Sequence, residues 1–152
     1  MARPPRYGDV RADDPLQTLA NAVLQSLAHA MHEQAPAALE GVDVEAVHDM
    51  RVAIRRLRSA LDAFDGCYPH RRRDAVAHAM RRLGRRLGAV RDADVHLGVL
   101  RSALAGATDA ERPGIAYAIE QLGERRRNAL ARFAIVYSQH DRGTVDRLTH
   151  GE

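Results

Sequence analysis

The sequence lacks the features of disulfide-stabilised, secreted and membrane-spanning proteins. Its single cysteine, Cys67, excludes an internal disulfide. It has no N-terminal apolar run of the kind that forms a signal peptide or a transmembrane helix. With 152 residues it has the length of one domain. We therefore expect a soluble, cytoplasmic protein that makes no contact with a membrane.

Lysine is also absent, and all 23 basic residues are arginine. Guanidinium groups hydrogen-bond phosphate oxygens in pairs, so a surface made only of arginine suits phosphate recognition. A GC-rich genome would favour arginine codons for an unrelated reason. The positions of the arginines are therefore better evidence of function than their identity.

The residue patterns of known enzyme sites are missing. There is no glycine-rich phosphate loop, no nucleophile beside a base and no carboxylate cluster for magnesium; Asp92 and Asp94 are the only close acids near the arginines. Tryptophan is absent and only six residues are Tyr or Phe, so few side chains could stack on bases. We expect a binding protein that is not an enzyme and needs no cofactor.

What the sequence does contain is a helix with two chemically opposite faces, over residues 47–64. At about 3.6 residues per turn, one face is apolar and predicts a core contact, with Met50, Ile54, Leu57, Leu61 and Phe64 on it. His48, Arg51 and Arg55 follow one another on the opposite face, with Arg56 and Arg58 to either side. This second face is a stripe of cations.

Positive charge is concentrated around this helix although the net charge is only +3. Residues 51–91 contain twelve arginines and three acids, a local balance of +9, so the rest of the chain carries −6. Among the twelve, Arg81, Arg82 and Arg85 lie with His78 on or beside the polar face of a further helix. Such segregation of charge predicts a polyanionic partner for the central segment.

The pattern of apolar residues, glycines and prolines predicts an all-α protein, an antiparallel four-helix bundle. We expect a flexible N-terminal arm over residues 1–12, a single helical domain over 13–138, and a polar C-terminal tail over 139–152 that frays. The helices are expected from Asp14, as N-cap, to about 34, from Asp43, as N-cap, to about 65, from 70 to 88, and from 112 to 137. The apolar phase changes after Val90, which predicts a kink or break over residues 88–94.

Two stretches of the chain resemble one known family. The string from His48 to Leu61, with Met50, Arg51, Val52, Ala53, Arg55, Arg56, Leu57, Arg58 and Ser59, resembles the signature of the CHAD family, the conserved histidine α-helical domain. A second match follows at Leu87, Gly88, Val90, Arg91, Asp92, Asp94 and Val95. The resemblance covers roughly residues 15 to 137 and corresponds to the first four-helix repeat, half of the family pattern; the second histidine-and-arginine helix has no copy in this sequence.

The stripe and the resemblance together predict that the chain binds inorganic polyphosphate or a similar polyanion through a basic groove. The residues predicted to bind the polyanion are His48, Arg51, Arg55, Arg56, Arg58, Arg81, Arg82, Arg85, Arg91 and Arg126. In the family, two repeats surround a basic channel. A single repeat therefore predicts a homodimer in which a second copy completes the channel. Polyphosphate binding would also associate the protein with polyphosphate granules.

Arg126 is the least certain member of this set because it falls on the apolar side of its helix, between Ile119, Leu122 and Leu130. A buried, unpaired arginine would be costly. Either it pairs with Asp92 or Asp94, or it points into a polar channel, which is the interpretation we prefer. A further interpretation of the second motif is that Arg91 and Asp92 do not bind a ligand and form a hydrogen-bonded corner of the chain instead.

Two other functions compete with polyphosphate binding. Binding to a nucleic-acid backbone would use the same arginines, although few residues could read bases. A metal-binding helical bundle would use His29, His32 and Glu33, which lie within about one turn of each other, but two histidines on one helix form an incomplete shell. No metal ligand is therefore assigned.

Overall fold

The computed structural model describes residues 10–140 and 143–150 of the chain, and within them all regular structure is helical. The helices are α1 (Leu16–Glu40), α2 (Val44–Ala63), α3 (His70–Ala105), α4 (Arg112–Ser138) and α5 (Thr144–His150), with a 3₁₀ turn at Asp65–Cys67. The all-α class is confirmed, and α5 is added to the four helices expected. Most of the N-terminal arm predicted over 1–12 lies outside the described residues. Among the described helices, none combines the length and apolar composition needed to span a bilayer.

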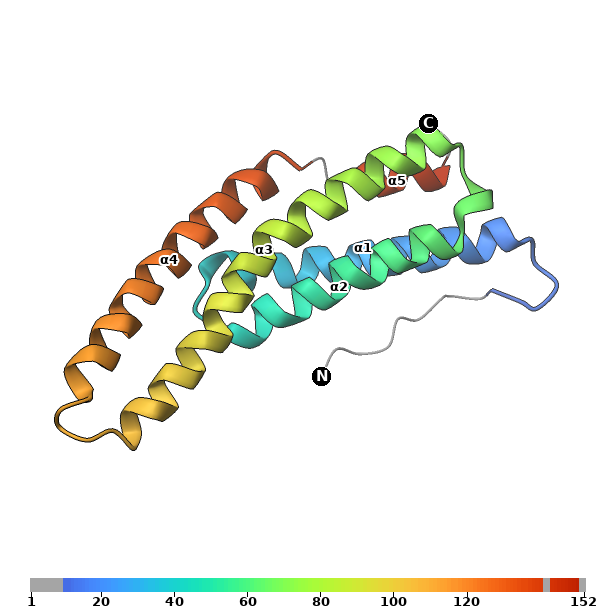
Figure 1. Cartoon of the computed structure of the whole chain (residues 1–152). Helices are drawn as coiled ribbons and strands as arrows, with labels where there is room; N and C mark the ends of the chain where they lie inside the picture. The colour runs from blue at the N-terminus through green and yellow to red at the C-terminus, as the bar shows by residue number, and fades with distance from the viewer. Residues whose placement is uncertain (1–9, 141–142, 151–152) are drawn as a thin grey trace.

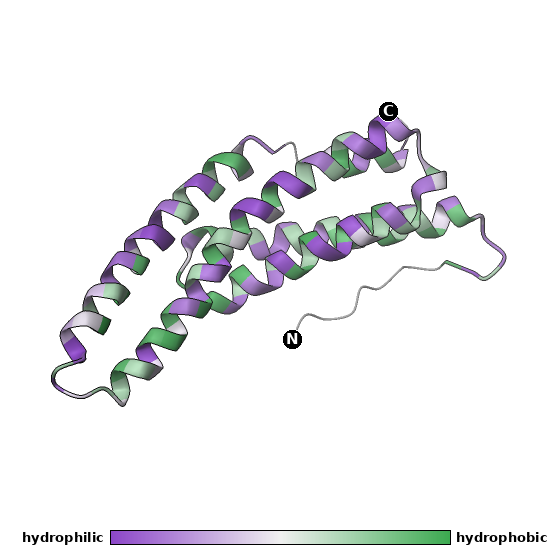
Figure 2. Cartoon of the chain, in the orientation of Figure 1, coloured by the Kyte–Doolittle hydropathy of each residue, from purple (hydrophilic) through white to green (hydrophobic). Residues whose placement is uncertain are grey.

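The helices form two antiparallel pairs, α1 with α2 and α3 with α4. The two pairs lie side by side over only part of the length of α3. Figure 1 shows α1 and α2 side by side, with α3 running back along α2 and then continuing past the α1–α2 turn together with α4. The short α5 lies against α1 and α3. The α3–α4 hairpin therefore projects beyond the core, and Figure 2 shows hydrophobic residues on this projecting part.

The core lies where α1, α2 and the first half of α3 meet. The apolar face predicted for α2 is buried, since Met50, Leu57 and Leu61 are 0% exposed; Phe64 is only half-buried. The predicted apolar positions of α3, from Val76 to Val90, are buried against it. In α4 only Phe133 and Tyr137 are fully buried, because its outer half packs on α3 alone.

The start of α2 follows the prediction, but both ends of α1 differ from it. Asp43 caps α2 by accepting a hydrogen bond from the Glu45 amide at 2.8 Å. Asp14 is not an N-cap; its carboxylate accepts from the Arg11 amide, and α1 follows Pro15 without a side-chain cap. The helix also continues through Pro36 to Glu40, where Gly41, at φ 68°, ends it in the left-handed conformation that glycine tolerates.

The break predicted over residues 88–94 is wrong, because α3 is continuous from His70 to Ala105. The apolar phase changes because the helix loses one of its two partners. Up to Val90 α3 packs against both α2 and α4, and beyond that point Ala93, Asp94 and Leu97 are buried as the helix continues along α4 past α2. Arg91 and Asp92 accordingly lie inside a helix and form no corner.

The prediction that the C-terminal tail frays is also wrong for residues 144–150. They form α5, whose Val145, Leu148 and Thr149 are buried. Two side chains of α1 hold it: the Asn21 amide donates to the Thr149 carbonyl at 2.9 Å, and the Gln25 amide donates to the Thr149 hydroxyl at 3.0 Å. Asn21 also accepts from the Tyr68 hydroxyl at 2.8 Å, and burial, with a smaller electrostatic effect of Cys67, raises the pKa of Tyr68 to about 12.

Candidate functional site

A groove between α2 and α3 carries the arginines predicted from the stripe. It has a volume of about 430 Å³ and is lined from α2 by Arg51, Arg55 and Arg58, and from α3 by Arg85. All four side chains are exposed. Asp92 lies among the lining residues and is the one acid there. The groove therefore presents four guanidinium groups and one carboxylate to solvent.

Two glycines of α3 allow this groove to form close to the helix backbone. A Cβ atom at Gly88 would lie 3.1 Å from Nη1 of Arg51, and one at Gly84 would lie 3.4 Å from Cγ2 of Ile54. A Cβ atom at Gly88 would therefore require the Arg51 guanidinium to shift by a few tenths of an ångström, whereas one at Gly84 would make an ordinary van der Waals contact. Gly88 belongs to the second motif found in the sequence, but neither its packing against Arg51 nor that of Gly84 against Ile54 could be predicted, because glycine inside a helical pattern indicates close packing only once the neighbour is known.

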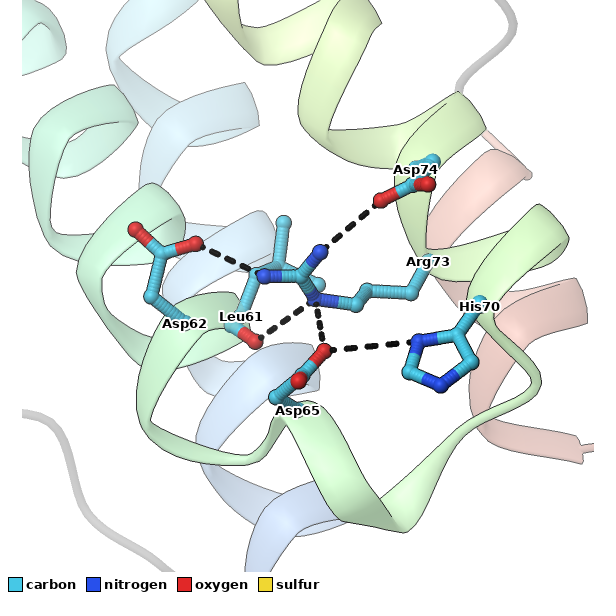
Figure 3. Close-up of polar contacts among 6 residues, drawn as sticks. All are labelled: Leu61, Asp62, Asp65, His70, Arg73 and Asp74. Carbon is cyan, nitrogen blue, oxygen red and sulfur yellow. Dashed lines mark hydrogen bonds and ion pairs between the residues drawn. The ribbon is translucent and has the colours of Figure 1, made fainter.

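The acids of the basic segment are gathered at one place, the turn between α2 and α3. Figure 3 shows Arg73 at the centre of this cluster. Its guanidinium contacts Asp62 at 3.0 Å, Asp65 at 2.8 Å and Asp74 at 2.8 Å, and its Nε donates to the Leu61 carbonyl at 3.3 Å. With its side chain 18% exposed, Arg73 is also far less accessible than its partners.

This cluster decides the charge of the groove. Asp62, Asp65 and Asp74 are the only acids between residues 51 and 91, and all three contact Arg73. Within the described part of the chain, the other eleven arginines of the segment form no ion pair. The fold thus concentrates the local acids on one arginine and leaves the rest available to an external anion.

The outer face of α3 extends the basic surface toward α4. A second hollow, of about 370 Å³, lies between these helices and is lined by His78, Arg82, Arg85, Arg86, Ala89 and Val136. Arg85 borders both this hollow and the groove. Arg81 is exposed on the same helix. The structure therefore brings two of the predicted arginines, Arg82 and Arg85, together with His78 in this hollow.

His48 and Arg91 do not line the groove, but they lie level with one end of it along α2 and α3. Because α2 and α3 are antiparallel, with Arg51 beside Gly88, His48 one turn earlier on α2 is level with Arg91 one turn later on α3. Both side chains are half-buried. A ligand that extends out of the groove at this end would pass close to both residues.

Two predicted site residues lie elsewhere. Arg56 is exposed but follows Arg55 by about 100° around α2, and it does not line the groove. Arg126 pairs with Asp94 of α3, and its side chain is 15% exposed while that of Asp94 is 2% exposed. The preference for a channel-facing Arg126 is therefore corrected in favour of the ion pair, which satisfies a charge that burial would otherwise make costly.

The histidines considered for a metal site have separate neighbours. His29 lies 3.2 Å from Glu33 on the exposed side of α1, whereas His32 lies 3.0 Å from the Tyr137 hydroxyl of α4. Across the described residues, no group of three or more His, Cys, Asp and Glu side chains is gathered as a metal ion would require. The geometry gives the metal-binding alternative no support.

Comparison with known proteins agrees with the motifs. The family model of the CHAD domain matches residues 22–148, which includes α2, α3 and α4 entirely and reaches into α5. A search of curated protein sequences finds no significant match. The matched segment contains the whole groove and the Arg73 cluster.

Proposed function

Because this chain belongs to the CHAD domain family, we propose that it binds inorganic polyphosphate, or a similar linear polyanion, and acts as a binding module rather than an enzyme. The observation that carries the proposal is the groove between α2 and α3. Its four arginines contact no acid of the described chain, so their charge is left for a ligand.

The spacing of these arginines suits a run of phosphates. Arg51, Arg55 and Arg58 extend over about 10 Å of α2, and like charges one turn apart destabilise a helix when nothing lies between them. A chain of phosphates would accept charge-assisted hydrogen bonds from each guanidinium. It would also release counterions as it binds, which adds to the affinity.

Adjacent arginines provide the test of the proposal. Arg55→Ala should weaken binding of long-chain polyphosphate about tenfold, because it removes a charged hydrogen-bond donor from the groove. Arg56→Ala removes the same charge from the neighbouring residue, which lies outside the groove, and should have a much smaller effect. Isothermal titration calorimetry would measure both, with circular dichroism to show that helix content is unchanged.

Equal losses in the two variants would show general attraction to a basic helix and would contradict a specific groove. A parallel competition among polyphosphate, duplex DNA, single-stranded RNA and heparin tests the class of ligand. Polyphosphate should displace the others at lower phosphate concentration. Preferred binding of RNA or DNA would favour the nucleic-acid alternative instead.

His48 is proposed as a further phosphate donor at the end of the groove, and its contribution should depend on pH. Histidine side chains gain a proton as the pH falls from about 8 to about 6, and a cationic ring attracts phosphate more strongly than a neutral one. Affinity should therefore rise on acidification, and His48→Ala should flatten the rise more than His78→Ala does. Identical pH profiles for wild type and His48→Ala would remove His48 from the site.

We also propose that two copies associate so that their grooves share one ligand. Val95 and Val99, which are 47% and 62% exposed, lie on α3 beyond Asp92 and give an apolar edge next to the basic surface. Contact through such an edge would keep the two sets of arginines apart until an anion bridges them, and a ligand that binds the dimer stabilises it by mass action. Sedimentation velocity should show more dimer when polyphosphate is added; a monomer that still binds long chains tightly would contradict this.

A further inference from the structure

Three hollows of the surface meet at one alanine of α3. Ala89 lines the groove between α2 and α3, the second hollow near Arg82 and Arg86, and a third hollow of about 400 Å³ between α3 and α4. Its side chain is exposed. Ala89 therefore borders all three hollows, at the point where the groove lies nearest to the surface of α4.

The third hollow carries a second set of basic side chains. Arg125 and Arg132 of α4 line it together with Asn128, and His96 of α3 faces them. Arg125, Asn128 and Arg132 recur at intervals of three and four residues, so they share one face of α4 over about 10 Å. Within the described chain neither arginine forms an ion pair.

We propose that this face of α4 is the second half of the polyanion site. A phosphate chain that fills the groove crosses α3 over Ala89 and continues along Arg125 and Arg132. The inference rests on the proposed function and extends it by naming the route of the ligand. It also sets a length requirement, because a chain of a few phosphates fits within the groove alone, whereas a long chain contacts both helices.

Asp92 provides a test of the route in which the expected result is a gain of affinity. It lines both the groove and the third hollow, and it is the one carboxylate among the described residues that line the three hollows. Phosphate oxygens passing between the groove and α4 would be repelled by it. Asp92→Asn should therefore strengthen binding of a long chain several-fold, the opposite of what loss of a ligand would do.

The decisive experiment compares two lengths of ligand on the full chain. Tripolyphosphate and long-chain polyphosphate are titrated into the wild type, Arg125→Ala/Arg132→Ala, and the control Arg101→Ala/Arg127→Ala. The control removes the same charge from exposed arginines of the same hairpin that line none of the three hollows. The first double variant should lose about tenfold in affinity for the long chain and keep wild-type affinity for tripolyphosphate, while the control loses much less.

A second variant tests the crossing point itself. Ala89→Trp places a large side chain between the hollows and should weaken binding of the long chain only, with thermal melting to show that the fold is intact. Equal affinity of the Arg125→Ala/Arg132→Ala variant and its control for long chains would overturn the proposed route. That result is distinct from failure of the proposed function, in which the wild type binds neither ligand or Arg51→Ala/Arg55→Ala binds both as the wild type does.

Discussion

Replacing Arg126 by alanine should lower the free energy of unfolding by about 3–5 kcal/mol, the usual cost of leaving a buried charge without its partner. Asp94, whose side chain is 2% exposed, loses its ion pair in this variant. Its second oxygen, Oδ2, is buried and accepts no hydrogen bond from the residues that the structure describes, so Arg126 is what compensates this carboxylate. Urea denaturation followed by circular dichroism would measure the loss.

The neighbouring residue and a double variant serve as controls. Arg127→Ala removes an exposed charge from the next position of α4 and should change stability by less than about 0.5 kcal/mol. Asp94→Leu/Arg126→Leu removes both charges and should recover most of the stability lost by Arg126→Ala. If Arg126→Ala were as stable as the wild type but bound polyphosphate poorly, Arg126 would be a ligand after all.

The sequence predicts best the helix that keeps one buried face along its whole length, which is α2. In α2 the apolar residues recur at helical spacing and all pack toward α1 and α3, so periodicity alone separates Leu57 from Arg55 correctly. The groove arginines follow from the same reasoning, because residues opposite the core must face solvent. Their lack of acidic partners, however, depends on the position of Arg73, and local pattern does not reveal that three aspartates converge on it.

Periodicity is misleading where a helix loses one of two partners. The apolar phase of α3 shifts after Val90 because the contact with α2 ends there and only α4 remains, and the same shift without α4 would indicate a break. The pairing of Asp94 with Arg126 depends on this arrangement, since it needs α3 to continue along α4 past α2. The sequence offered the pair as an alternative, but only the packing of the two helices distinguishes an ion pair from a channel-facing arginine.

Weakly apolar segments are a further limit of reading the chain alone. Residues 144–150 have only Val145 and Leu148 as large apolar side chains, which is too little to predict a stable helix. The structure supplies the missing interactions from α1, through the hydrogen bonds of Asn21 and Gln25 to Thr149. The same limit applies to Arg125 and Arg132, whose proposed role depends on a hollow that exists only when α3 and α4 lie together.

Raising the salt concentration from about 50 to about 200 mM should weaken binding of long-chain polyphosphate by about 50-fold if the four groove arginines alone neutralise phosphates. With Arg125 and Arg132 also engaged, the loss should approach about 300-fold, because each neutralised phosphate adds a released counterion. The plot of log affinity against log salt therefore counts the arginines in contact. A titration series over this range measures it for the wild type and for variants.

The same salt titration on variants shows which arginines contribute to the number of phosphate contacts. Arg51→Ala/Arg55→Ala should reduce the steepness of the salt dependence by about 1.4, at about 0.7 for each phosphate contact removed. Arg56→Ala should leave the slope near that of the wild type, because Arg56 lies about 100° away around α2 and does not line the groove. A slope that falls equally in all these variants would mean that the ligand responds to the total charge of the helix, and the groove would then have no special role in binding.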